Sequence, residues 1–77
     1  FKKEISGRSF VLTGELETLS REEAKNIIKS FGGKVSSAVS KKTDFVVVGA
    51  NPGSKYNKAK TLGVRTLNES EFKKIFN

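Results

Sequence analysis

The sequence contains no cysteine and no histidine. Without cysteine the chain can form no disulfide, and without either residue it lacks the usual ligands of a zinc site. The same absence excludes histidine-based acid–base catalysis and the Ser-His and Cys-His nucleophile pairs. No pair of carboxylates has a catalytic setting either. We therefore predict no catalytic residue and no metal ligand in these 77 residues.

Long hydrophobic runs are also absent. No apolar stretch approaches the roughly 18–20 residues that span a bilayer, and there is no signal-peptide pattern, so we expect no membrane partner. The length suits one domain at most. Because the first residue is Phe1 and not methionine, we expect residues 1–77 to be excised from a longer chain. We also expect this single domain to be a monomer.

Acidic residues are the minority charge. Eight Asp and Glu residues against 15 Lys and Arg residues give a net charge of +7. Such an excess favours a polyanionic partner, with nucleic acid as the leading candidate. Charge alone leaves open the alternative of a basic domain that has no such partner.

Four strands are expected. Two continuous apolar runs, over residues 9–13 and 45–48, suit strands that are covered on both faces, as in a parallel sheet. Residues 34–35 begin a short edge strand, and residues 64–67 form the last strand. Residues 1–7 are a lead-in to the first strand.

Three helices alternate with these strands, over residues 21–31, 55–62 and from residue 69 onward. Each follows a polar residue that can cap its N-terminus, and two of the three have the Ser/Asn-x-x-Glu pattern of a capping box. Gly32 is placed for a left-handed C-cap of the first helix. The capping residues are Ser20 with Glu23 for the first helix, Ser54 for the second, and Asn68 with Glu71 for the third.

This order of elements predicts an α/β fold, a four-stranded parallel sheet of order 2-1-3-4 flanked by three helices. Ligands of open α/β sheets bind at the carboxyl ends of the strands, where the strand order reverses, here between the first and third strands. The topology brings Thr13, Gly14, Arg21 and Lys55 toward that place, with Lys58 one turn further along the second helix.

These residues suit an anion. The Thr13 hydroxyl and the Gly14 N–H could hold a phosphate oxygen, although a strand end with a simple turn explains the same dipeptide. Arg21 and Lys55 stand in the first turns of helices, where the dipole disfavours a cation unless an anion is near. Solvated surface cations are the alternative.

Two further stretches have weaker signals. Lys41 and Lys42 lie in a polar segment that is either a solvated loop or a DNA-backbone contact. Asp44 precedes the strand at residues 45–48 and is expected to cap the turn before it. Residues 49–55 end in Gly-Ser-Lys but lack the G-x-x-x-x-G-K-[ST] order of a nucleotide-binding P-loop, so we do not expect nucleotide hydrolysis.

Several short motifs follow one another in a specific order and spacing. They are Phe10-Val-Leu-Thr-Gly14, Ser20-Arg-Glu-Glu-Ala24, Gly32-Gly-Lys-Val35, Ser40-Lys-Lys-Thr-Asp44 before Phe45-Val-Val-Val, and Gly53-Ser-Lys55 followed by Lys58-Ala59-x-x-Leu62-Gly63-Val64. Together they resemble a BRCT domain, most closely the single one at the C-terminus of bacterial NAD-dependent DNA ligases. The BRCT domain of the large subunit of eukaryotic clamp loaders (replication factor C) shares most of them and is the alternative.

The resemblance implies a four-stranded parallel sheet with three helices. In phosphate-binding members it places the site on Thr13, Gly14, Arg21 and Lys55, with Lys58 as a supporting cation. The chain lacks the tryptophan that many BRCT domains carry in the last helix, and Phe72 stands in that region. That departure argues against a tandem pair that reads phosphopeptides.

The function implied is that of a non-catalytic DNA-binding module of an NAD-dependent DNA ligase, active in replication and repair in the bacterial cytoplasm at the nucleoid. Its partners would be nicked or 5′-phosphorylated duplex DNA and other domains of the parent ligase. The NAD, Mg²⁺ and Zn²⁺ sites of that parent lie outside these residues, so no cofactor is expected here. Lys41, Lys42, Lys58 and Lys60 would add non-specific attraction to the DNA backbone. A protein-interaction module with an apolar site is the alternative.

Overall fold

The computed structural model describes residues 5–76, so the first four residues of the expected lead-in lie outside the described part. Its strands form one parallel sheet in the order β2-β1-β3-β4, which confirms the predicted fold class and topology. The elements are β1 (Ser9–Thr13), α1 (Arg21–Ser30), β2 (Lys34–Ser36), β3 (Phe45–Val48), α2 (Ser54–Leu62), β4 (Arg65–Leu67) and α3 (Glu69–Ile75).

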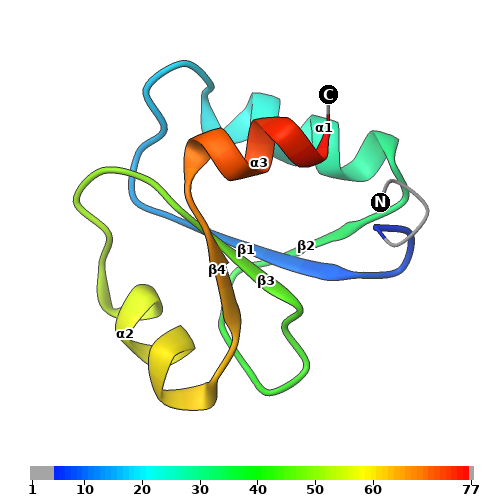
Figure 1. Ribbon diagram of the computed structural model, residues 1–77. Helices are drawn as coiled ribbons and strands as arrows, with labels where there is room; N and C mark the ends of the chain where they lie inside the picture. The colour runs from blue at the N-terminus through cyan, green and yellow to red at the C-terminus, as the bar shows by residue number, and fades with distance from the viewer. Residues whose placement is uncertain (1–4, 77) are drawn as a thin grey trace.

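The helices cover both faces of the sheet. Helices α1 and α3 lie together on one face and α2 lies on the other (Figure 1). Side chains alternate along a strand, so Phe10 and Leu12 join the core under α1 and α3, while Val11 joins a second core under α2. This two-sided burial is why the central strands are continuous apolar runs.

Helix α1 begins where its sequence predicts and ends at Ser30, one residue before the predicted end. The Ser20 hydroxyl accepts the Glu23 N–H at 3.1 Å, and the Glu23 carboxylate accepts the Ser20 N–H at 3.1 Å. At the other end Gly32 adopts φ 84°, and the Gly33 N–H donates to the Ile28 carbonyl at 2.9 Å. A side-chain cap of this kind contributes about 1 kcal/mol of stability. Arg21 is therefore held in a fixed first turn.

Helix α2 begins differently from the prediction. Ser54 is not its cap but its first helical residue, and the cap position is Gly53, whose backbone is extended and which supplies no side-chain cap. The Gly53 N–H donates to the Thr13 hydroxyl at 3.3 Å, which joins this cap position to the end of β1. The last strand also starts one residue later than expected, because the Val64 N–H closes α2 by donating to the Ala59 carbonyl at 2.9 Å.

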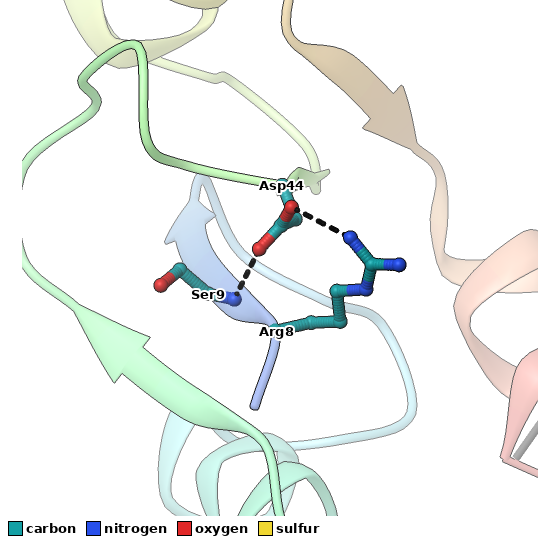
Figure 2. Close-up of polar contacts among 3 residues, drawn as sticks. All are labelled: Arg8, Ser9 and Asp44. Atoms are coloured by element: carbon teal, nitrogen blue, oxygen red, sulfur yellow. Dashed lines mark hydrogen bonds and ion pairs between the residues drawn. The ribbon is translucent and has the colours of Figure 1, made fainter. Parts of the chain in front are cut away.

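Asp44 joins two strands instead of capping a turn. Its carboxylate accepts the Ser9 N–H at 2.8 Å and contacts the Arg8 guanidinium at 3.3 Å, as Figure 2 shows. The preceding turn is closed without it, since the Ser40 N–H donates to the Thr43 hydroxyl at 3.0 Å. The expected capping role of Asp44 is therefore wrong. This contact lies at the amino ends of β1 and β3, away from the predicted site.

Candidate functional site

The loops that leave β1 and β3 are tied together at the carboxyl edge of the sheet. The Gly49 N–H donates to the Thr13 carbonyl at 2.8 Å. Beyond it, Glu15 and Ala50 exchange two backbone hydrogen bonds, of 3.0 and 2.8 Å, in an isolated antiparallel bridge. The backbone at the end of both strands is therefore fixed in one place, so the groups that follow it are held there as well.

The close contact between the loops that follow β1 and β3 requires glycine at two positions. Gly14 adopts φ 76°, and a Cβ atom there would lie 2.6 Å from the Ala50 carbonyl oxygen. A Cβ atom on Gly49 would overlap the backbone of Glu15. Both the left-handed conformation and the close approach exclude a side chain at Gly14. The glycine of the Thr-Gly dipeptide thus has a structural role, whatever it binds.

Four of the predicted site residues line one cavity of about 420 Å³ at this edge: Thr13, Gly14, Arg21 and Lys55. The rest of its wall is formed by the loop before α2 and by one acidic residue. Those residues are Ala50, Asn51, Gly53, Ser54 and Glu15. Asn51 was not predicted, and it is the one non-glycine among the described residues with a positive φ, at 51°.

The polar groups of the cavity leave donors available. Thr13 is only 5% exposed, and its hydroxyl oxygen already accepts the Gly53 N–H. A hydroxyl that accepts one bond can still donate its own proton. Helix α2 meets the cavity with no side-chain cap and no acidic residue in its first turn, whereas α1 and α3 have both. The positive end of the α2 dipole is therefore not offset by any residue of that helix's first turn.

The two cations of the cavity have no counter-ion among residues 5–76. Neither Arg21 nor Lys55 forms an ion pair with any described residue, and the ion pair that the structure shows is that of Arg8 with Asp44. Glu15 is the one carboxylate in the wall of the cavity. The balance of charge at the site is positive, which favours an anionic ligand.

The other predicted cations are not brought to this cavity. Lys58 is exposed one turn further along α2 and does not line it. Lys41 and Lys42 are exposed in the turn before β3, at the opposite edge of the sheet. The Lys60 ammonium lies over the Tyr56 ring, 4.5 Å from its centroid. Their proposed contact with a nucleic-acid backbone stays a prediction, separate from the cavity.

A second basic cavity adjoins the first and was not predicted. Its volume is about 300 Å³, and Arg21 and Lys55 belong to its wall as well. Lys25, Lys29, Ser36 and Ser37 supply its other polar groups. The available sequence signal was the spacing of cations four residues apart along the polar face of α1, from Arg21 to Lys29.

Glu69 anchors the loop between β1 and α1. Its carboxylate accepts the N–H groups of Glu17 and Thr18, at 2.8 and 2.9 Å, and the Thr18 hydroxyl as well. The bond from the Thr18 hydroxyl is the main cause that lowers the pKa of Glu69. The Thr18 and Glu17 N–H groups and the charge of Lys73 lower it further, against a smaller opposing effect of burial. The loop that carries the chain from Gly14 to Arg21 is thereby fixed to α3.

An apolar cavity of about 440 Å³ lies between α1 and α3. Its wall consists of Leu19, Ile27, Phe31, Phe72, Phe76 and Lys73.

No helix among residues 5–76 is long and apolar enough to cross a membrane.

Comparison with known proteins adds relatives for nearly the whole chain. A family model described as the BRCA1 C Terminus (BRCT) domain matches residues 2–76. A protein named DNA ligase from Coxiella burnetii (strain Dugway 5J108-111) is 57% identical over 74 residues, which are 96% of this chain and 11% of that protein. Another from Prochlorococcus marinus (strain NATL1A) is 63% identical over 69 residues, 90% of this chain and 10% of that protein. The chain thus spans about a tenth of the length of these curated relatives.

Proposed function

This chain belongs to the BRCT family, and from that membership we propose that it is a non-catalytic DNA-binding module of an NAD-dependent DNA ligase that holds nicked DNA by a phosphate, during replication and repair. Relatives named DNA ligase at 56–63% identity support a ligase parent over a clamp-loader subunit. The observation that carries the binding proposal is the single cavity lined by Thr13, Gly14, Arg21 and Lys55.

Each of the four residues would have a distinct part in holding a phosphate. The Thr13 hydroxyl and the Gly14 N–H donate to phosphate oxygens. The Arg21 guanidinium can donate two parallel bonds, and the Lys55 ammonium adds a compact charge. The N-terminus of α2 adds its dipole, because the structure gives this helix no cap of its own. A terminal phosphate carries more charge than a phosphodiester, so the site should prefer a 5′ phosphate.

The module does no chemistry of its own. Among residues 5–76 no group of three or more His, Cys, Asp or Glu side chains is placed to hold a metal ion, so the donor set does not fit the Mg²⁺ or Zn²⁺ of a ligase. Binding of the chain alone should be weak, on the order of micromolar or weaker, as for non-specific DNA contacts. Tethering within a longer protein would raise its effective concentration on DNA. Lys41, Lys42 and Lys58 add backbone attraction.

The test compares two DNA duplexes that differ only in one group. One carries a recessed 5′ phosphate and the other a 5′ hydroxyl, and the binding of the 77-residue chain to each is titrated at several salt concentrations. We expect tighter binding of the phosphorylated duplex at every salt concentration. Equal binding of both would leave only non-specific attraction, and no binding at low salt would refute a DNA site.

A second candidate function, a protein-interaction module, has one observation in its favour. The apolar cavity between α1 and α3 is bordered by three phenylalanines, Phe31, Phe72 and Phe76, and its occupant would be another domain of the parent ligase. The two functions are separable because the basic and apolar cavities share no residue. Ile27→Glu would weaken such docking and leave DNA binding unchanged.

A further inference from the structure

The second basic cavity differs from the phosphate cavity because its wall contains no acidic residue. Its charged residues are all cations, Arg21, Lys25, Lys29 and Lys55, and no carboxylate lines it. Its remaining wall is formed by Leu12 and Val35 and by the polar Ser36 and Ser37. The arrangement is a basic groove between α1 and the end of the edge strand β2, with hydroxyl groups on its far side.

Three of these cations form a row on one helix. Arg21, Lys25 and Lys29 are four residues apart and therefore follow one another along the same face of α1. Like charges at this spacing destabilise an isolated helix. No member of the row forms an ion pair with another described residue. Lys29 suits the last turn through the helix dipole, but that reason does not extend to Lys25 or Arg21.

The groove adjoins the phosphate cavity. Arg21 and Lys55 belong to the walls of both, so an anion in one cavity is next to an anion in the other. One phosphate cannot occupy both volumes, of about 420 and 300 Å³. A nucleic-acid strand, in contrast, presents phosphates at a regular repeat.

We propose that this groove is a second anion subsite that takes the phosphodiesters following the gripped phosphate on the same DNA strand. The inference rests on the proposed function and adds to it a direction: the strand runs along α1 from Arg21 toward Lys29, with its 5′ end in the cavity of Thr13. Ser36 and Ser37 donate hydrogen bonds to the phosphodiester oxygens from the opposite wall.

The experiment compares two double variants of the full chain, Lys25→Gln/Lys29→Gln and Lys73→Gln/Lys74→Gln. Each removes two positive charges from one helix, α1 or α3, and only the first pair lines the groove. The slope of log affinity against log salt is measured on the duplex with the recessed 5′ phosphate. The groove variant should reduce the slope by about 1.8 and the control should change it little. Circular dichroism melting verifies that both variants fold.

Two measurements, the salt slope and the preference for 5′ phosphate, distinguish a failure of this inference from a failure of the proposed function on which it rests. The preference for 5′ phosphate over 5′ hydroxyl reports the cavity of Thr13, and the groove variant should retain it. Equal slope changes in the groove and control variants would overturn the second subsite, even if the wild-type chain prefers the phosphate. A wild-type chain that shows no preference for 5′ phosphate would instead refute the proposed function.

Discussion

The Thr13 hydroxyl oxygen accepts a hydrogen bond from the Gly53 N–H at 3.3 Å. This contact joins the end of β1 to the cap position of α2, 40 residues later in the chain. It holds the uncapped N-terminus of α2 at the cavity while the Thr13 hydroxyl keeps its own proton to donate. One side chain thus both builds the candidate site and supplies one of its donors.

Replacement of Thr13 distinguishes the hydrogen bonds of its hydroxyl from the packing of its side chain. Thr13→Val keeps the branched shape but removes the hydroxyl, so the Gly53 N–H loses its partner and the phosphate loses a donor. We expect a loss of about 1 kcal/mol in the free energy of unfolding and a smaller preference for 5′ phosphate. Chemical denaturation and DNA titration measure the two effects. Thr13→Ser is the control, and a Val variant that binds like the Ser variant would contradict the assignment.

Neutralisation of the cavity cations should weaken phosphate binding. Arg21→Gln and Lys55→Gln each remove a charge that no described residue offsets. Each should lower affinity for the 5′-phosphorylated duplex about tenfold, or about 1.4 kcal/mol, without a change in melting temperature. Lys74→Gln, on exposed α3 surface, is the matched control. Equal losses in all three variants would mean that only net charge matters.

Removal of the Glu15 charge should strengthen phosphate binding, in contrast to removal of the cations. It is the one carboxylate that lines the cavity, and it repels the anion that we place there. Glu15→Gln should therefore tighten binding of the 5′-phosphorylated duplex, by up to about fivefold, since an exposed charge pair is worth about 1 kcal/mol or less. Titration at low salt measures it. Weaker binding would contradict this repulsion and would mean that the Glu15 side chain instead stabilises the loop.

A side chain at Gly14 should disrupt the close contact between the loops that follow β1 and β3. In Gly14→Ala the new Cβ atom would meet the Ala50 carbonyl oxygen in a left-handed backbone conformation. We expect a loss of about 2 kcal/mol or more in the free energy of unfolding. Gly53→Ala is the control, because its backbone is extended and no atom lies within 4 Å of the added carbon. Similar losses in both variants would contradict this explanation.

The Glu69 anchor makes part of the stability depend on pH. The pKa of Glu69 is lower in the folded chain, chiefly because the Thr18 hydroxyl donates to its carboxylate. Its contribution is therefore fully present above the unfolded pKa of about 4.3 and is lost as the pH falls through the lower, folded pKa. Melting temperatures between about pH 6 and pH 3 should fall less steeply for Glu69→Gln than for the wild type. Glu17→Gln should behave as the wild type does.

The fold could be predicted because its signals are local. The apolar runs of β1 and β3, the capping boxes of α1 and α3, and the alternation of strands and helices together leave one topology. Four site residues followed from that topology, because the carboxyl ends of parallel strands meet at one edge. Ser54 is the first residue of α2 and not its cap, and the contact of the true cap position, Gly53, with the distant Thr13 has no local signal.

The remaining contacts have no local signature. Glu69 binds a loop 51 and 52 residues before it, and Asp44 binds Ser9 across 35 residues, so nothing in their neighbourhoods indicates either role. Lys25 and Lys29 had a visible spacing, but only the position of β2 beside α1 turns that row into the wall of a groove. Long-range side-chain contacts form only in the assembled fold, and the local sequence pattern does not specify which residues make them.

The most direct test of the phosphate site is an NMR titration of the ¹⁵N-labelled chain with 5′-phosphorylated and 5′-hydroxyl oligonucleotides of one sequence. The account predicts that the amide signals of Gly14, Ser54 and Lys55 shift with the phosphorylated strand and much less with the hydroxyl strand. Equal shifts with both strands, or shifts confined to the apolar cavity between α1 and α3, would contradict it.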